Sequence, residues 1–130
     1  MPFKIEFHKQ NEILRVDIFG IREKGKIVED AKEAWKQIAK ACQESGLDRF
    51  LVTSHVTGDY SISNAYSINS VLDQFGVSRR WKIAYVVLDE KAYETLKFAE
   101  TVAINRGFRG KVFQDEVEAY NWLVSKTSTA

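Results

Sequence analysis

The chain is poor in the residues that build covalent cross-links and metal sites. It has one cysteine, Cys42, in 130 residues, which excludes an internal disulfide and a zinc site made of several cysteines. Its two histidines, His8 and His55, are not spaced at i, i+4 from another ligand, so no metal site is predicted. No cofactor is predicted either.

A strong charge of one sign and a long hydrophobic run are also missing. The 19 basic and 18 acidic residues leave a formal charge of +1, so no global field attracts nucleic acid or a membrane surface. No apolar run approaches membrane-spanning length, and the segment MPFKIEFHKQ lacks the apolar core of a signal peptide. We therefore expect a cytoplasmic protein with no membrane span and no nucleic-acid partner.

The composition is that of a globular domain, with 45% hydrophobic and 28% charged residues. The length suits one domain with a core of its own and is too short for two. We assign residues 1–124 to this domain. The segment SKTSTA, residues 125–130, is predicted to be a disordered tail.

Two kinds of apolar spacing alternate along the chain. FKIEFH and ILRVDIFG alternate in polarity and predict a β-hairpin. Apolar residues at helical spacing predict helices over residues 27–42, 62–75 and 90–106, with strands RFLVT, WKIAYVVL and KVFQ after them. A last helix starts at Asp115, in a segment that resembles a capping box with Glu118, and Asp89 is placed to cap the third helix.

The order ββαβαβαβα predicts one α/β domain with a mixed, mostly parallel five-stranded sheet and four helices. Helices that alternate with apolar strands imply parallel strands joined by right-handed crossovers, and the hairpin adds one antiparallel strand.

This order, with the hairpin first and a polar loop before the second helix, resembles the STAS domain of anti-sigma-factor antagonists and sulfate transporters. The stretch FAETVAINRGFRGKVFQDEVEAYNWL is similar to the C-terminal part of small bacterial SpoIIAA-like, or STAS/SEC14-like, proteins. There, too, a helix ends in an Asn-Arg-Gly turn, a Val-Phe strand follows, and an acidic helix start closes with Trp-Leu. The likeness covers residues 3–124 in element order and the last third in residue pattern. It implies a STAS-like fold, but a fold alone does not determine function.

The resemblance also indicates a phosphoacceptor position. In the anti-sigma antagonists, the loop before the second helix carries an Asp-Ser-Ser-Gly pattern whose serine is phosphorylated by a partner kinase. Ser63 falls near that position, but Ile62 and Asn64 flank it in place of the aspartate and the glycine.

The run TSHVTGDYSISN, residues 53–64, gathers most of the chemistry in one loop. Ser54, His55 and Asp59 are the residue types of a catalytic triad, but neighbouring strand residues point to opposite faces, so we predict no triad and no enzyme. A helix N-terminus favours an anion, and Thr57, Ser61, Ser63 and Asn64 add polar groups, with Arg22 or Arg106 as further candidates. The alternative is that Ser61 or Ser63 only caps the helix.

The third helix is apolar around more than one face. Its residues Tyr93, Leu96, Phe98, Ala99, Val102 and Ala103 make a band wider than a single sheet-facing stripe requires. A partner subunit, an apolar ligand or a well-covered core position each explains such a band. For a homodimer, Phe98 and Val102 are the expected contacts. The basic segment RRWK, residues 79–82, is too narrow to indicate nucleic-acid binding.

Together these observations predict a non-enzymatic, STAS-like regulatory or binding module. It would recognise a partner protein or a small anionic ligand at the loop before the second helix. The alternative is a SEC14-like carrier of a lipid or an apolar metabolite. An apolar cavity beneath the third helix would favour the carrier.

Overall fold

The fold is built on a five-stranded sheet, seen in a computed structural model that describes residues 3–125. The strands are β1 (Lys4–Gln10), β2 (Ile13–Phe19), β3 (Arg49–Ser54), β4 (Lys82–Val87) and β5 (Arg109–Phe113). They lie side by side in sequence order. β1 is antiparallel to β2, and the remaining neighbours are parallel. The predicted mixed, mostly parallel sheet is therefore confirmed.

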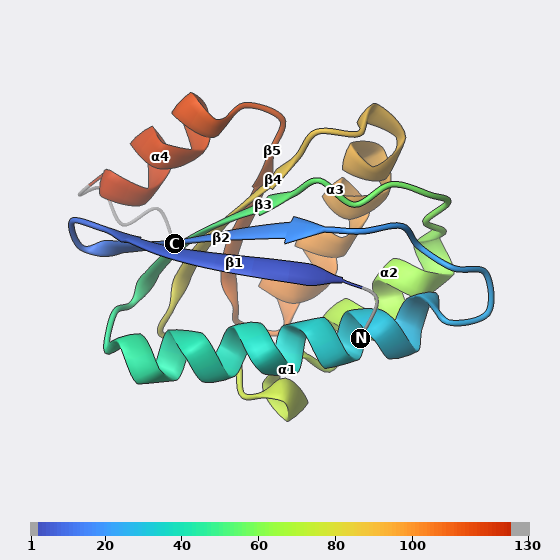
Figure 1. The fold of residues 1–130 in the computed structure, drawn as a ribbon, viewed down its shortest axis with the longest axis horizontal. Coiled ribbons are helices and arrows are strands. Elements are labelled where there is room, and N and C mark those ends of the chain that lie inside the picture. The colour runs from blue at the N-terminus through green and yellow to red at the C-terminus, as the bar shows by residue number, and fades with distance from the viewer. Residues whose placement is uncertain (1–2, 126–130) are drawn as a thin grey trace.

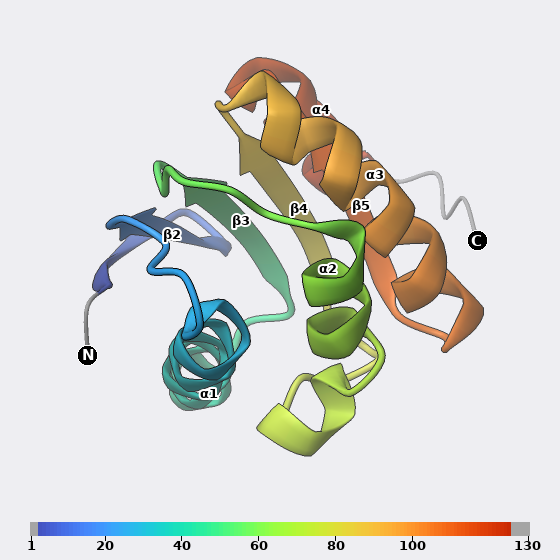
Figure 2. The ribbon, with the colours of Figure 1, turned by 90° about the vertical axis from the view of Figure 1, so that its right-hand side faces the viewer.

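Four α-helices cover the sheet unequally: α1 (Ile27–Ser45), α2 (Ile62–Asn69), α3 (Glu90–Asn105) and α4 (Glu116–Val124). Each of the first three connects one strand to the next in the same direction, and right-handed crossovers of this kind put their helices on one face. Figure 2 shows α2 between α1 and α3. The last helix, α4, follows β5 and lies on the opposite face, above the strands in Figure 1.

The two faces carry separate cores. Under α1, the buried residues include Leu14, Val16 and Ile18 of β2 with Phe50 and Val52 of β3. Under α4, Ile13, Leu51, Ala84, Val86 and Phe113 pack with Ala119 and Leu123 of the helix. α4 contacts β3, β4 and β5. Apart from Ile13 and Phe19, the same face of β1 and β2 carries polar residues, among them Arg15 and Asp17.

The second helix is shorter than predicted, and this changes the expected order of elements. α2 ends at Asn69, and a separate 3-10 helix, η1 (Leu72–Phe75), follows it. Asn69 donates a side-chain hydrogen bond to the carbonyl of Ala65 at 2.9 Å, and such a bond competes with the helical backbone pattern. Val71 then leaves helical geometry (φ −129°, ψ 25°). The apolar spacing of Leu72 and Phe75 continues across this break, which is why the sequence predicts one helix.

The ends of other elements also differ from the prediction. β5 begins at Arg109, two residues before the predicted KVFQ strand. Asp89 is the N-cap residue of α3 but accepts no side-chain capping bond. Asp115 caps α4 by accepting from the amide of Val117 at 3.2 Å. Gly46 ends α1 in the left-handed region (φ 72°).

Of the predicted tail, residues 125–130, only Ser125 lies within the described residues. Within residues 3–125, no helix combines the length and the apolar character needed to cross a bilayer.

Candidate functional site

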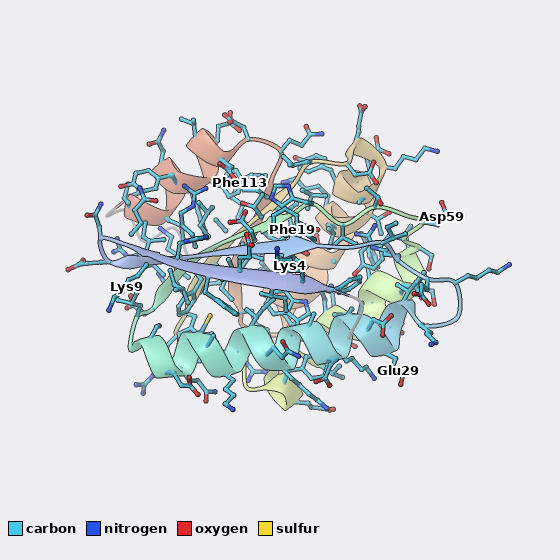
Figure 3. All side chains as sticks on the ribbon, viewed as in Figure 1. Lys4, Lys9, Phe19, Glu29, Asp59 and Phe113 are labelled. Atoms are coloured by element: carbon cyan, nitrogen blue, oxygen red, sulfur yellow. The ribbon has the colours of Figure 1, made fainter. Side chains whose placement is uncertain are left out.

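The loop from Thr57 to Asn64 leads from the carboxyl end of β3 into α2. Thr57, Ser61 and Ser63 are exposed there, and Asn64 is half-buried. The hydroxyl of Ser61 accepts a hydrogen bond from the amide of Asn64 at 3.1 Å. This confirms the predicted serine cap and identifies Ser61, not Ser63, as the capping residue. Asp59 lies in the same loop, at the carboxyl end of the strands (Figure 3).

Arg22, one of the two arginines considered for an anion site, holds this loop in place. Its amide donates to the carbonyl of Thr57 at 2.8 Å, and its Nη1 donates to the carbonyl of Gly58 at 2.8 Å. Its guanidinium lies 4.6 Å from the ring centroid of Tyr60. Gly58 has φ 104°, and a Cβ there would come within 3.1 Å of Arg22, so this turn needs glycine. The other candidate, Arg106, ends α3 at the amino edge of the sheet, far along the strands from this loop.

The residues of the rejected triad are separated by the sheet. Ser54 faces α1 and lines a small hollow there. His55, the next residue, faces the other side, where its Nε2 lies 3.1 Å from Oδ1 of Asp17. Neighbouring positions of an extended strand point to opposite faces, so Ser54 and His55 do not meet.

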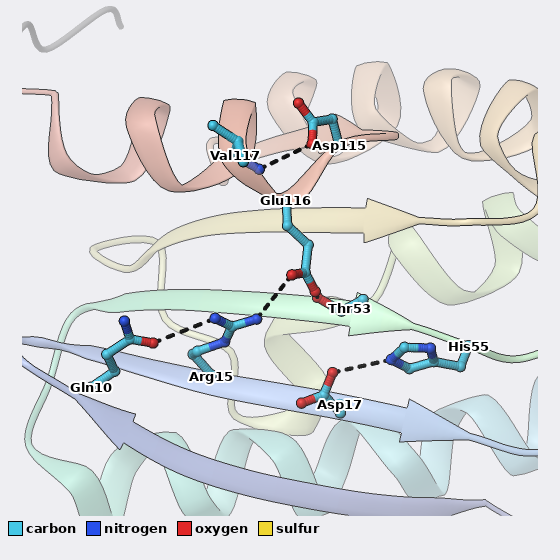
Figure 4. Close-up of polar contacts among 8 residues, drawn as sticks. All are labelled: Gln10, Arg15, Asp17, Thr53, His55, Asp115, Glu116 and Val117. Carbon is cyan, nitrogen blue, oxygen red and sulfur yellow. Dashed lines mark hydrogen bonds and ion pairs between the residues drawn. The ribbon is translucent and has the colours of Figure 1, made fainter.

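A polar network on this second face was missed by the sequence. His55 stacks on Phe19, with ring centroids 4.4 Å apart, while it pairs with Asp17. One strand register away, the carboxylate of Glu116 accepts from Thr53 Oγ1 at 3.0 Å and from Arg15 Nη2 at 3.1 Å (Figure 4). The alternation of β2 indicates that Arg15 and Asp17 share a face, but not that β3 and α4 bring partners to them.

This network has the residue types of acid–base chemistry but none of the geometry of a metal centre. Within residues 3–125, no group of three or more His, Cys, Asp and Glu side chains is arranged to hold a metal ion. Thr53 is almost fully buried, and its hydroxyl is already used by Glu116. The network therefore joins α4 to the sheet and has no free nucleophile.

An apolar cavity of about 70 Å³ lies on the other face, beneath α3. Trp81, Ile83 and Tyr85 line it in turn, so it follows β4 for about 13 Å. Its remaining walls come from α1, the loop after β3, α2, η1, the loop before β4, α3 and β5. They include Trp35, Tyr60, Leu72, Leu96, Ala99, Ala103, Phe108 and Val112.

Three aromatic residues close one end of this cavity. The rings of Trp35 and Tyr85 stack at a centroid distance of 6.0 Å. A second hollow of about 40 Å³ shares Trp35, Tyr60 and Tyr85 as walls. Burial raises the pKa of the Tyr60 and Tyr85 phenols above their ordinary value, so both remain protonated at neutral pH. Each protonated phenol keeps an O–H donor, and the Tyr85 phenol also forms a hydrogen bond with Ser54.

The sequence pointed to this cavity only indirectly. The wide apolar band on the third helix includes Leu96, Ala99 and Ala103, and these three residues are cavity walls. Phe98 is 41% exposed and Val102 is half-buried, and neither is a cavity wall. These two residues lie one turn apart on the outer side of α3.

Comparison with protein-family models finds no family that matches the chain, and comparison with curated proteins finds no relative.

Proposed function

We propose that the chain is a non-enzymatic binding module of STAS-like architecture that holds a small apolar ligand in the cavity beneath α3. The observation that carries this proposal is the aromatic-walled cavity itself. Binding sites for small molecules are concave, mostly apolar, and carry a few fixed polar groups. Here the polar groups include the phenols of Tyr60 and Tyr85, and the lining also contains Asn69, Ser78, Glu100, Arg109 and Lys111.

The size of the cavity limits the ligand. Its volume of about 70 Å³ is roughly half that of an engineered 150 Å³ cavity that admits benzene. The ligand is therefore slender, a short alkyl chain or a single small ring with a hydrogen-bonding group. A whole membrane lipid, as a SEC14-like carrier would hold, needs α3 or η1 to move outward.

The loop before α2 is the element through which a partner would sense the ligand. Tyr60 belongs to this loop and is also a wall of the cavity. Thr95 of α3 donates to the carbonyl of Tyr60 at 3.1 Å, which ties the loop to the helix above the cavity. A ligand that displaces Tyr60 shifts the exposed Thr57, Ser61 and Ser63 on the outside. In this arrangement the loop keeps its expected regulatory role, and ligand binding in the cavity controls the conformation of the loop.

An enzymatic role for the same site is less well supported. Asp17 and His55, the one histidine–carboxylate pair among the described residues, lie on the opposite face of the sheet from the cavity. A general base must come within hydrogen-bond reach of the group that it deprotonates. This pair therefore has no access to a molecule beneath α3.

Titration with a series of linear alcohols, from propan-1-ol to octan-1-ol, tests the proposal. Affinity should improve by about 0.8 kcal/mol per added CH₂ until the cavity is full and then level off. Amide chemical shifts should move at Tyr60, Tyr85 and Leu96. Ala103→Leu fills part of the cavity and should shorten the chain at which affinity levels off.

Ile104→Ala is the matched control, because Ile104 is on the same helix but is 50% exposed and outside the cavity. It should leave the alcohol series unchanged. The proposal is wrong if the shifts scatter over the surface, or if Ala103→Leu binds the alcohols as the parent protein does.

A further inference from the structure

The fold gathers several basic residues at one edge of the sheet. Six cations gather at the amino ends of the parallel strands, from three segments that are far apart in the sequence. We call this set the basic edge: Arg49, Arg79, Arg80, Lys82, Arg106 and Arg109. Only the short run RRWK was visible in the sequence, so the basic edge is a product of the fold.

Its centre is a row of three cations on adjacent strands. Arg49 of β3 is in register with Lys82 of β4, and Lys82 is in register with Arg109 of β5. Neighbouring strands lie about 4.8 Å apart, and side chains at matched positions share a face. Like charges at directly opposite positions destabilise a sheet. Burial lowers the pKa of Lys82, and electrostatic repulsion from Arg49 and Arg109 lowers it further.

The middle cation has a structural role of its own. Lys82 Nζ donates to the carbonyl of Trp122 at 2.6 Å and lies 4.5 Å from the Trp122 ring centroid. It therefore caps the carboxyl end of α4, where a cation is favourable. This contact explains why a lysine occupies this buried position, and it holds the Lys82 ammonium in place.

Arg49 and Arg109, which flank Lys82, have no comparable structural contact. Among residues 3–125, the side chains of Arg49 and Arg109 make no hydrogen bond and no ion pair with protein. Arg49 is half-buried and Arg109 is exposed. Two guanidinium groups with unused donors thus flank a fixed ammonium.

The neighbouring loops extend the positive surface. Arg79 Nε donates to the carbonyl of Arg106 at 2.7 Å, and the Arg79 guanidinium lies 4.6 Å from the Phe108 ring centroid. These contacts fix the loop before β4 against the turn before β5. Asp73, 3.7 Å from Arg79, offsets part of the charge.

The opposite edge is unfavourable for anions. Aspartates follow the carboxyl ends of β3, β4 and β5, at Asp59, Asp89 and Asp115. They occupy or precede the N-termini of α2, α3 and α4, where an anionic ligand would otherwise gain from the helix dipoles. This distribution argues against the small anion expected at the loop before α2 and favours an anion at the amino edge.

We propose that Arg49, Lys82 and Arg109 form the floor of a binding site for a small oligophosphate. An arginine guanidinium can donate two parallel hydrogen bonds to a pair of phosphate oxygens. A ligand with several adjacent phosphate groups matches a row of three cations better than a single phosphate does. The row spans about 10 Å across three strands, the scale of a small molecule. Asp48 precedes Arg49, Asp73 lies 3.7 Å from Arg79, and the net charge is only +1, so the described residues offer no extended basic track for a nucleic-acid strand. Arg109 is also a wall of the cavity beneath α3, whereas Arg49 and Lys82 are not, so the loss of binding in Arg49→Gln separates this site from the cavity.

Calorimetric titration of the full chain with inorganic phosphate, pyrophosphate and tripolyphosphate tests the proposal, together with amide chemical shifts. Affinity should rise in that order, with shifts centred on Arg49, Lys82 and Arg109. Arg49→Gln and Arg109→Gln should each weaken tripolyphosphate binding about tenfold, the value of one charged hydrogen bond. Lys91→Gln removes an exposed cation at the opposite edge and should leave tripolyphosphate binding unchanged.

Three outcomes would overturn the proposal. Shifts centred on Ile62 to Asn64 would return the anion site to the start of α2. Equal weakening in Lys91→Gln would reduce the effect to general charge attraction. Tighter binding of a 12-nucleotide single-stranded RNA than of tripolyphosphate would identify a polymer as the partner. Circular dichroism of each variant verifies that the affinities compare folded proteins.

Discussion

The hydroxyl of Thr53 donates a hydrogen bond to Glu116 at 3.0 Å and so joins the carboxyl-terminal part of β3 to the first residue of α4. Arg15 of β2 donates to the other oxygen of the same carboxylate at 3.1 Å. One side chain thus connects two strands to the helix that covers them. Because α4 follows the last strand, no further strand limits where it packs, and this contact helps to set its position.

Thr53→Val should therefore lower the free energy of unfolding by about 1 kcal/mol, the usual net contribution of one hydrogen bond. Thr53 is 1% exposed, and valine has nearly its shape, so the packing should be kept. Glu116 remains paired with Arg15 and partly solvated. Urea denaturation measures the loss. If Thr53→Val costs the same in a Glu116→Ala background, the hydrogen bond contributes nothing and the loss comes from elsewhere.

The cap at the start of α2 allows a matched pair of serine variants. Ser61→Ala removes the acceptor of the Asn64 amide and should cost about 1 kcal/mol of stability. Ser63→Ala is the control, because Ser63 is exposed and is not the capping residue. Thermal unfolding of the two variants measures the difference. Equal melting temperatures would mean that the Ser61 bond does not stabilise the helix.

Much of the sheet could be predicted because its signals are local. The alternation in FKIEFH and ILRVDIFG and the apolar run RFLVT each indicate a strand without knowledge of the rest of the chain. The error in the second helix has the same origin. Val71, Leu72 and Phe75 continue a helical spacing. This spacing does not reveal that the Asn69 side chain donates to the carbonyl of Ala65 and that the helix ends there.

The candidate sites also differ in whether their residues are close together or far apart in the sequence. Ser61 and Asn64 are three residues apart, so their contact follows from a local capping rule. The cavity needs Trp35, Tyr60 and Tyr85 from three separate elements, and the basic edge needs Arg49 and Arg109 in one sheet register. Proximity between residues this far apart in the sequence depends on the order of the strands in the sheet, which apolar spacing does not specify.

Self-association through α3 remains a prediction. Phe98 and Val102 lie on one outer face of the helix, and closed two-fold dimers are the commonest assemblies. Phe98→Glu should weaken the dimer by about 2 kcal/mol, or about thirtyfold, if Phe98 is central to the interface. Sedimentation velocity over a concentration series measures this shift. Val117→Glu, at a 65% exposed position on α4, should have no effect. A parent protein that stays monomeric at high micromolar concentration would contradict the dimer.

The buried thiol of Cys42 should make stability fall in alkaline solution. Burial raises the pKa of Cys42 to about 12. The unfolded chain loses this proton near pH 9, so from pH 9 upward the folded state binds more protons than the unfolded state, and the free energy of unfolding falls as pH rises. Between pH 8 and pH 10 the loss should be about 1.4 kcal/mol, and Cys42→Ala should lack it.

Urea denaturation of both proteins at the two pH values isolates this effect. Tyr60 and Tyr85 also have raised pKa values and lower stability in the same direction at higher pH, but they are present in both proteins and cancel in the comparison. The stability difference between parent and Cys42→Ala should therefore shrink from pH 8 to pH 10. A difference that stays constant would show that Cys42 titrates alike in the folded and unfolded chains, and its burial would then not govern its protonation.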